Sequence, residues 1–491
     1  MTLALISSAN YPGWNVNALT SLTSSGTTAT ATTTVATNIQ SGSSVTIAGA
    51  TPSAYNGTYV VTVTGTNTFT YTFAGGTSPA TGTKTATGGR LTVPGVVWMD
   101  GYFFVMDTQA VIYNCDLNTP ATWNALSFIG AIQRPGIGVA LNRIHNYVVA
   151  FKDSSIEFFY DAGNSPGSPL SPYQGAFLEI GCAAGTSVVN TSDTLFFLGQ
   201  TRQTGRRVYK FNGMVPEPVS TTDVERILIA DDLATVRAFS ALLGGHQFYI
   251  LTLVTSNITL AYDDTTKTWA KWTSLTAQSP KSVTTLTQVA GVATATVAAH
   301  GYADGDPVLI AGANQSGYNG TVNISYVDAN TFTYTVASAT VTPATGTITA
   351  VGYTEGYFKY SNYVACGGRD LLLGESDGNL YQLAETTFQD NSLPINVVIQ
   401  TSLIDGQDDK GKFWKELRVI GDKVAGTARV RYTNDDYQTF SAYRSIDLSS
   451  IRARLSRLGK AARRAFTFRY TDNTALRVES LELTAGKGSE K

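Results

Sequence analysis

The feature that most constrains the fold is a segment that occurs twice in the chain. Residues 45–89 and 308–352 share Tyr-Asn-Gly-Thr, then Asn-Thr-Phe-Thr-Tyr-Thr and finally Pro-Ala-Thr-Gly-Thr. The first two matches are separated by 263 residues and the third by 264, so the spacing drifts by one residue over the whole segment. A repeat that keeps its register in this way indicates that one fold is used twice.

Each copy has the pattern of a β structure. The Asn-Gly dipeptides that begin at Asn56 and Asn319 favour tight hairpin turns, because both residue types tolerate a positive φ. Aromatic residues alternate with threonine from Phe69 and from Phe332, so one face of each strand is expected to be buried and the other wet.

We predict two small β-sandwiches, residues 20–90 and 284–352, inserted into a larger host domain. The upstream segments 20–44 and 284–307 are also similar and extend each copy to about 70 residues. The simplest interpretation is a spacer or a decoration on an assembly surface. The alternative is a pair of sugar-binding adhesin modules.

The rest of the chain has a period of its own. Apolar strands begin about every fifty residues once the second copy is left out, at Tyr102, Tyr147, Phe196, Phe248 and Leu372. An aromatic residue marks a later strand of each unit, at Tyr113, Tyr160, Tyr209, Tyr262 and Tyr381. Because β-propeller blades repeat at about 40 to 50 residues, we predict a propeller-like host domain.

The predicted host domain comprises residues 1–19, 91–283 and 353–395. Five units are visible, and residues 1–19 with the segment after 386 are candidates for a sixth. The alternative is an ordinary β-sandwich with irregular repeats.

The composition agrees with an all-β fold and limits the function. Charged residues make up 14% of the 491 residues, with 46 Gly, 25 Tyr and 21 Phe, where about a quarter charged is usual for a soluble domain. Aromatic residues suit pleated sheets and glycine suits their turns. A formal net charge of −2 argues against a protein that grips nucleic acid over its whole surface.

Targeting signals and cysteine chemistry are not evident. The first residues lack a basic region followed by a long apolar run, and the most apolar stretch, 239–254, is interrupted by Gly244 and Gly245. We therefore expect a soluble product of the cytoplasm, without stable membrane insertion, unless a larger assembly carries it elsewhere. Cys115, Cys182 and Cys366 lie far apart and are expected to be small buried residues.

Residues 396–491 form a predicted C-terminal β-rich domain with a basic segment. Residues 433–440 resemble the Asp-box turn of sialidase blades, which stabilises a turn and is not catalytic. The segment from Arg444 to Arg477 contains nine basic residues and only two acidic ones, which gives a net charge of +7 over 34 residues. Such a segment is expected to face something anionic. The candidates for contact with DNA or a partner protein are Arg452, Arg454, Arg457, Lys460, Arg463 and Arg464.

The secondary structure of the basic segment and the partner of its charge each allow two interpretations. The spacing of Leu448, Ile451, Leu455 and Leu458 suits a helix, whereas Gly459 and the flanking strands suit an extended form. The positive charge is also compatible with a solvated face or with ion pairs between subunits.

No catalytic, cofactor or metal site is predicted. His145, His246 and His300 sit in unrelated contexts, and no phosphate-binding loop or Cys-x-x-Cys motif occurs. Paired acids such as Asp231-Asp232 and Asp408-Asp409 are explained as turn residues. We expect a protein that is not an enzyme, although a glycosidase needs only two suitably spaced carboxylates.

Several segments resemble a known family. They are Ser155–Asn164, Ile180-Gly181-Cys182, Phe197-Leu198-Gly199, and Val208-Tyr209 with Val219-Ser220-Thr221. Together they resemble the packaged-DNA stabilisation proteins of short-tailed bacteriophages, which are tail hub or nozzle proteins. The segment Leu455–Phe466 also resembles a recurrent segment of phage tail components. The resemblance is best over 91–283 and looser over 353–491, and the two inserted copies depart from the family pattern.

The resemblance implies a structural protein of the virion tail, assembled in the host cytoplasm. It implies a propeller-containing subunit of a homo-oligomer, a hexameric ring below the portal and adaptor proteins. Such a ring continues the DNA channel and helps retain the genome until ejection, with transient non-specific contact to double-stranded DNA. Tail fibres or a needle are further implied partners. A glycan-binding adhesin of a phage or bacterium, using the propeller or the inserted modules, is the alternative function.

Overall fold

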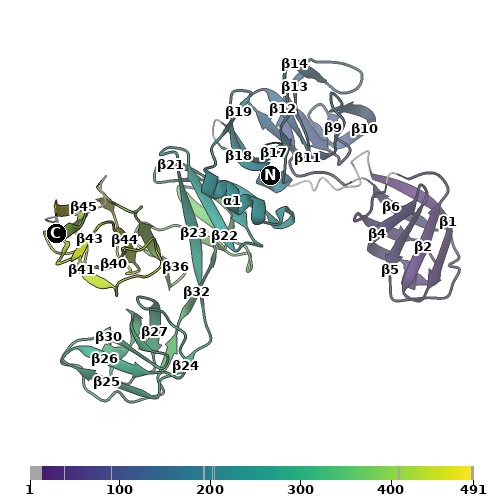
Figure 1. The fold of residues 1–491 in the computed structure, drawn as a ribbon. Coiled ribbons are helices and arrows are strands. Elements are labelled where there is room, and N and C mark those ends of the chain that lie inside the picture. Colours follow the sequence, from purple (N-terminus) through teal and green to yellow (C-terminus); the bar gives the residue numbers. More distant parts are fainter. Residues whose placement is uncertain are drawn as a thin grey trace. The chain divides into compact units, whose positions relative to one another are not determined.

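The structure is a computed structural model that describes residues 14–487, apart from 38, 90, 192–193, 202, 204 and 407–409. The described residues form an almost entirely β structure with one α-helix, α1 (Thr222–Ala230), which confirms the predicted all-β class (Figure 1). The chain divides into two compact units, residues up to Ser256 with Leu260–Ala270, and Asn257–Thr259 with residues from Lys271 onward. The predictions made for residues 1–13 and for Asp408-Asp409 lie outside the described residues.

The first inserted copy is a closed barrel in the first unit. Its strands are β1 (Trp14–Ser25), β2 (Thr28–Thr33), β3 (Ser44–Ala48), β4 (Gly57–Gly65), β5 (Thr68–Thr72) and β6 (Thr85–Gly89). They pair in the order β1-β2-β5-β4-β3-β6, and β1 returns to β6. The long strands β1 and β4 each take part in two sheets, so the predicted sandwich is closed at both sides.

The start of this copy differs from the predicted boundary at residue 20. Trp14 pairs with Gly89 and Ala18 with Thr85, so residues 14–19 belong to the barrel and not to the host domain. The sequence similarity between the copies does not reach this edge, because the matching edge of the second copy is a much shorter strand.

The second inserted copy has the same topology with two strands interrupted. Its strands are β24 (Lys281–Ser282), β25 (Thr285–Val289), β26 (Val292–Thr296), β27 (Pro307–Ala311), β28 (Gly320–Asn323), β29 (Ser325–Asp328), β30 (Thr331–Thr335) and β31 (Thr349–Val351). They form the sheets β24-β31-β27-β28 and β25-β26-β30-β29. Thus β24 and β25 correspond to β1, and β28 and β29 correspond to β4.

Both copies are held by the same buried aromatic residues. Tyr55 and Phe69 in the first copy, and Tyr318 and Phe332 in the second, are buried in the centres of the two cores. The hydroxyl of Tyr71 donates to Tyr55 O at 3.1 Å, and its counterpart Tyr334 donates to Tyr318 O at 3.2 Å. The predicted reuse of one fold is confirmed.

The host domain of the first unit consists of antiparallel sheets whose strands pair largely in chain order. Host sheet 1 contains β7 (Val97–Met99), β8 (Tyr102–Met106), β9 (Val111–Asp116) and β10 (Thr119–Gly130). Host sheet 2 contains β11 (Gly138–Ile144), β12 (Tyr147–Lys152), β13 (Ile156–Asp161) and β14 (Leu170–Leu178). Host sheet 3 contains β15 (Gly181–Cys182), β16 (Val189–Asn190), β17 (Leu195–Thr201), β18 (Gly205–Asn212) and β19 (Val215–Pro218).

The remaining host strands follow the same pattern. Host sheet 4 contains β20 (Arg237–Leu243), β21 (His246–Leu253), β22 (Ile258–Asp263), β23 (Thr268–Ala277) and β32 (Tyr353–Tyr357). Host sheet 5 contains β33 (Tyr360–Cys366), β34 (Arg369–Gly374) and β35 (Leu380–Gln382). The strands β36 (Gln389–Asp390) and β37 (Leu393–Pro394) pair only with each other among the described strands. Since residues 14–19 belong to the barrel, the sixth unit expected from residues 1–19 and the segment after 386 does not form as predicted within the described residues.

The second inserted copy enters and leaves host sheet 4 through adjacent strands. Ala277 at the end of β23 pairs with Tyr353 at the start of β32. The amide of Gln278 also donates to Gly352 O at 2.9 Å. The whole copy therefore replaces the turn of one β-hairpin.

Neighbouring host sheets pack face to face through apolar side chains. Sheets 1 and 2 share a buried core that includes Phe104, Met106, Leu141, Val148 and Phe159. Sheets 2 and 3 share a second core in which the rings of Phe151 and Phe197 lie 5.2 Å apart. Short 3₁₀ turns and α1 connect strands; the 3₁₀ turns are Ser53–Tyr55, Gly185–Ser187, Leu233–Thr235 and Ser316–Tyr318.

A buried ion pair fixes the connection from sheet 1 to sheet 2. The Lys152 Nζ lies 2.6 Å from Glu157 Oε1, and the side chains are 0% and 1% exposed. Lys152 also donates to Ala131 O at 2.8 Å and to Arg134 O. All three ammonium protons therefore have acceptors, as a buried charge requires.

The C-terminal domain is a two-sheet β-sandwich. One sheet contains β38 (Val397–Gln400), β40 (Thr427–Thr433), β41 (Arg444–Asp447) and β44 (Ala465–Tyr470). The other contains β39 (Lys412–Gly421), β42 (Arg454–Ser456), β43 (Lys460–Ala461) and β45 (Val478–Lys487). Trp414, Leu417, Val430 and Phe468 lie in one buried cluster, which places the core between the sheets.

Candidate DNA- or partner-facing surface

The basic segment of the C-terminal domain is extended. Leu455 at the centre of β42 is buried, whereas Arg454 and Ser456 on either side are exposed. The helical alternative is wrong, because Ile451, which would lie on the apolar face of that helix, is 89% exposed. The alternation of an edge strand therefore decides which cations of the segment reach the surface.

Arg464 does not belong to this surface. It is 1% exposed, and its Nε donates to Asn434 Oδ1 at 2.8 Å. Its guanidinium lies 3.9 Å from the ring centroid of Tyr432 and 5.6 Å from that of Trp414. Burial lowers the pKa of this guanidinium from its ordinary value. The prediction that Arg464 faces DNA or a partner is corrected, because aromatic rings and backbone acceptors of its own domain enclose it.

Two of the exposed candidates are already paired with carboxylates of the same domain. Arg454 lies 3.2 Å from Glu416 Oε2, and Glu416 also pairs with Arg418. These arginines, Arg418 first, hold the pKa of the Glu416 carboxyl below its usual range. Arg463 lies 2.6 Å from Asp436 Oδ2. Their charges are therefore partly compensated within the domain.

The other three candidates, Arg452, Arg457 and Lys460, are exposed and form no ion pair in the described part of the chain. We call them the unpaired cations. Arg457 has a positive φ of 58° in the turn between β42 and β43. The Lys460 ammonium lies 5.6 Å from the ring of Phe413, which is 48% exposed. These residues are the part of the segment that keeps its charge available to an anionic partner.

The acidic turn in the segment 433–440 behaves as its sequence predicted. The Asp435 carboxylate accepts from the Thr439 amide at 2.9 Å and from the Thr433 hydroxyl at 2.7 Å. The hydrogen bonds, above all from the Thr439 hydroxyl, lower the pKa of Asp435 to about 2. The residue therefore stabilises a turn.

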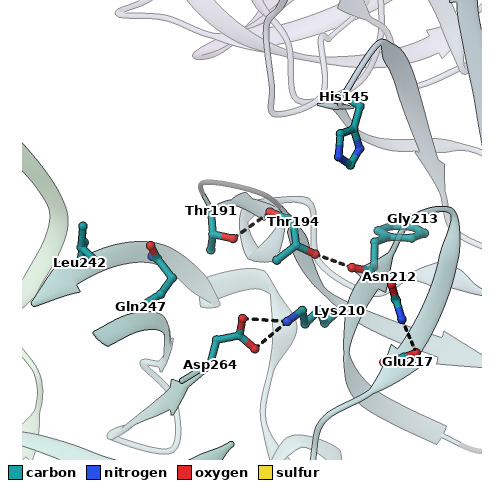
Figure 2. Close-up of a pocket in the computed structure, with 11 residues that line it drawn as sticks. His145, Thr191, Thr194, Lys210, Asn212, Gly213, Glu217, Leu242, Gln247 and Asp264 are labelled. Carbon is teal, nitrogen blue, oxygen red and sulfur yellow. Dashed lines mark hydrogen bonds and ion pairs between the residues drawn. The ribbon is translucent and has the colours of Figure 1, made fainter. Parts of the chain in front are cut away.

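A polar pocket of about 640 Å³ lies among host sheets 2, 3 and 4 of the first unit (Figure 2). Lys210 in its lining forms an ion pair, with Nζ 2.8 and 2.7 Å from the two carboxylate oxygens of Asp264. The Asn212 amide donates to Glu217 Oε1 at 2.9 Å. Figure 2 shows His145 on a separate hairpin, apart from the Lys210–Asp264 pair. No motif in the sequence predicted this pocket, because its lining residues are scattered from 145 to 264.

The remaining histidines and the cysteines have structural surroundings. His246 Nδ1 lies 2.7 Å from Asp263 Oδ2, and His300 is buried in the second copy. Cys115 and Cys182 are buried as expected, whereas Cys366 is exposed, which corrects that part of the prediction.

The described residues offer neither a metal cluster nor a helix suited to cross a membrane. Over 14–487, with the gaps stated above, His, Cys, Asp and Glu nowhere gather in threes in a way that suits a metal ion. In the same residues, no helix combines the length and the hydropathy that a membrane crossing demands.

Comparison with known proteins assigns the family. A family model described as "Bacteriophage P22 Gp10, beta-propeller" matches residues 13–292, more than half of the chain. The chain belongs to this family. The P22 Gp10 family places it among bacteriophage structural proteins associated with the virion and with stabilisation of packaged DNA. The host domain is therefore β-propeller-like, as the period of the sequence predicted.

Other comparisons add little to the P22 Gp10 assignment. No curated protein matches the chain. The computationally designed Ika8 protein has 10% identity and a TM-score of 0.25, covering 74% of this chain and 96% of its own. An exo-beta-1,3-galactanase from Phanerochaete chrysosporium has 9% identity and a TM-score of 0.25, covering 79% and 96%. The WD40 domain of Toxoplasma gondii coronin has 8% identity and a TM-score of 0.25, covering 75% and 93%. At these scores the three structures have no bearing on function.

Proposed function

We propose that the protein is a tail hub or nozzle subunit of a short bacteriophage tail. In this role its copies form a ring, hexameric in our proposal, that continues the DNA channel below the portal and adaptor. The ring helps to retain the packaged genome and then passes it during ejection. The family match over residues 13–292 is the observation that carries this proposal.

The charge distribution is compatible with a channel that lets DNA slide. A wall that binds phosphates strongly would hold the genome, whereas a few cations give weak attraction that falls steeply with salt. The chain has a formal net charge of −2, and ion pairs partly compensate the charges of Arg454 and Arg463. Arg452, Arg457 and Lys460 remain as the proposed contacts with DNA or with the acidic face of an adjoining ring.

The proposed role is structural and not catalytic. In the pocket, Asp264 is paired with Lys210 and Glu217 accepts from Asn212, so both acids are engaged in holding strands together. The partners in this proposal are sister subunits, portal and adaptor proteins, and tail fibres or a needle. Assembly in the host cytoplasm and a final place in the tail of the virion belong to the same proposal.

The oligomeric state of the purified full-length chain tests the proposal. We expect rings in negative-stain electron microscopy, and native mass spectrometry should give one dominant closed oligomer. A protein that stays monomeric at every concentration, both alone and with portal or adaptor rings, contradicts a ring-forming hub.

A second candidate function, a glycan-binding adhesin, is favoured by the pocket among host sheets 2 to 4. Its lining includes the hydroxyls of Thr191 and Thr194 and the amides of Asn212 and Gln247, groups that can bind sugar hydroxyls. A glycan array with the full chain distinguishes the two functions. Specific binding by the monomer that is lost in Asn212→Leu supports the adhesin, and rings without glycan binding support the hub.

A further inference from the structure

The two inserted copies share one backbone turn that is not part of the repeated sequence motifs. In the first copy the turn is 40–43, and in the second it is 303–306. Gly42 (φ +89°) donates to Val61 O at 2.8 Å, and Gly305 (φ +83°) donates to Ile324 O at 2.9 Å. A second backbone hydrogen bond also matches, because the amides of Ser43 and Asp306 donate to Gln40 O and Ala303 O, both at 3.1 Å. The backbones are equivalent, so differences in side chains can be compared directly.

At the second position of the turn, serine in the first copy corresponds to aspartate in the second. Ser41 Oγ accepts from the Val63 amide at 2.8 Å, and Asp304 Oδ1 accepts from the equivalent Tyr326 amide at 3.1 Å. The aspartate has a further oxygen, and this Oδ2 accepts from the Tyr443 amide of the C-terminal sandwich at 3.2 Å. The substitution therefore preserves the turn and adds a contact outside the copy.

At the fourth position, Ser43 in the first copy corresponds to Asp306 in the second, and the aspartate again makes one contact inside the turn and one outside it. Ser43 Oγ donates within its own turn to Gln40 O at 2.7 Å. Asp306 Oδ2 accepts within its turn from the Ala303 amide at 2.8 Å, and Oδ1 lies 3.2 Å from Arg469 Nη1. Again one carboxylate oxygen serves the turn and the other reaches the C-terminal sandwich.

The C-terminal sandwich presents a surface that needs such acceptors. Arg429 on β40 and Arg469 on β44 are directly opposite each other, an arrangement of like charges that is unfavourable without counter-charges. Arg429 donates to Ile324 O at 3.0 Å and to Asn323 O at 2.5 Å in the second copy. Thr471 donates to Asn323 Oδ1 at 2.8 Å. Val60 occupies the Asn323 position in the first copy and offers no side-chain acceptor.

The first copy uses its turn for a different neighbour. Its first position is Gln40, where the second copy has Ala303. Gln40 Oε1 accepts from the Thr108 hydroxyl at 2.7 Å and from the Leu91 amide at 3.3 Å. Leu91 precedes β7 and Thr108 follows β8, so both lie beside host sheet 1. Alanine at this position can make neither contact.

We infer that this turn is the docking element of the repeated module and that its side chains select the neighbour. Gln40 attaches the first copy to the segments beside host sheet 1, through Leu91 and Thr108. Asp304 and Asp306 attach the second copy to the C-terminal sandwich, Asp304 through the Tyr443 amide and Asp306 through Arg469. The two copies thus have one fold and two different binding specificities, whatever the role of the whole protein in the virion.

Exchanging the side chains of the two copies tests this inference in the full chain. In D304S/D306S, which carries the residues of the first copy, hydrogen exchange of peptides that contain Tyr443 should accelerate by roughly tenfold or more, a loss of about 1.4 kcal/mol of protection. Exchange around Leu91 should not change. In Q40A, the peptides around Leu91 should exchange faster and those around Tyr443 should stay as in the wild type.

Two further variants keep the test interpretable. V327T also exchanges a residue of the second copy for that of the first. Val327 lies next to Tyr326 on β29, but its side chain is exposed and makes none of the contacts described above, so this variant should change neither region. R469Q removes the partner on the sandwich side and should accelerate Tyr443 exchange even if D304S/D306S unfolds the module. Unchanged hydrogen exchange near Tyr443 in both D304S/D306S and R469Q overturns the inference. It is also overturned if either D304S/D306S or Q40A accelerates exchange equally near Tyr443 and near Leu91.

Discussion

Arg464 and Arg452 belong to one basic segment and have opposite surroundings. Arg464 is 1% exposed, donates to Asn434 and to Leu458 O, and lies over Tyr432. Arg452 is exposed and makes no ion pair among the described residues. The same residue type therefore stabilises the sandwich at one position and keeps its charge available at the other.

Replacing each arginine by methionine should separate these roles. We expect R464M to lose about 2–4 kcal/mol of stability, because Asn434 and Leu458 O lose their buried partner. R452M should change stability by less than about 0.5 kcal/mol. Hydrogen exchange of peptides from the C-terminal domain, recorded during thermal unfolding, measures the loss of stability in both variants. Equal effects of the two substitutions would show that Arg464 is not a core residue.

The pH dependence of stability should reveal Asp263. Burial alone would raise the pKa of this carboxyl, but hydrogen bonds from the Thr266 hydroxyl, His246 and the Thr265 and Thr266 amides lower it to about 2. The folded pKa lies below the ordinary value of about 3.9, so the stabilisation is complete above about pH 4 and is lost as the pH falls towards 2.

The wild type should therefore be more stable than D263N above pH 4, and the difference should shrink between pH 4 and pH 2. Thermal unfolding of both proteins at four pH values across this range measures the difference. A difference that stays constant down to pH 2 would contradict the assigned role of Asp263.

At the scale of elements, the connection between propeller sheets depends on close backbone contacts. Gly95 has a φ of +103°, and a Cβ there would lie 1.8 Å from Leu141 O. Pro94 O accepts from the Leu141 amide at 2.9 Å, so this segment ties the start of sheet 1 to β11. A side chain at residue 95 would push the two strands apart.

We expect G95A to destabilise the propeller by about 3 kcal/mol, from backbone strain together with loss of the Pro94–Leu141 contact. Its matched control is G213A, in the hairpin between β18 and β19, where φ is +62° and nothing lies within 4 Å of the added Cβ. That variant should lose about 1–2 kcal/mol from the left-handed conformation alone. Chemical denaturation of the full chain compares them, and equal losses would exclude the backbone contact as the cause.

Much of the element scale follows from local patterns in the sequence. The predicted strands at Tyr102 and Tyr147 begin β8 and β12, because alternation and turn residues are local signals. The extension of β1 back to Trp14 was not predictable, since only pairing with β6 makes residues 14–18 part of the barrel. The sixth unit failed for the same reason, because it required residues that pair elsewhere.

The candidate surface was predictable only in part. Net charge located the basic segment, but the charge of a side chain does not reveal its partners. Glu416 and Asp436, which pair with Arg454 and Arg463, are 38 and 27 residues away in the chain. The enclosure of Arg464 by Trp414 and Tyr432 likewise depends on three strands that meet only in the folded domain. Whether the remaining cations face DNA stays a prediction.

At the scale of the whole molecule, the unpaired cations should govern contact with DNA. We expect R452E/R457E/K460E to bind double-stranded DNA more weakly, and the slope of log K against log salt should fall by about 2–3, or about 0.9 for each lost phosphate contact. Phage particles that carry this variant should lose DNA or fail to attach tails.

A matched control for this variant is K271E/R369E/K423E, which reverses three exposed cations outside the segment. It should leave the salt slope and the infectivity unchanged. If the two triple variants weaken DNA binding equally, total charge and not this surface is responsible. If neither changes DNA retention, the segment has no part in holding the genome.

The adjacency of β23 and β32 has a consequence for the history of the chain. Ala277 and Tyr353 are paired on adjacent strands, so everything between them can be exchanged for a short turn without disturbing the register of host sheet 4. A recombination event at this point therefore gains or discards some seventy codons in one step, and related phages are expected to differ here by presence or absence of an entire module while the surrounding blade stays the same.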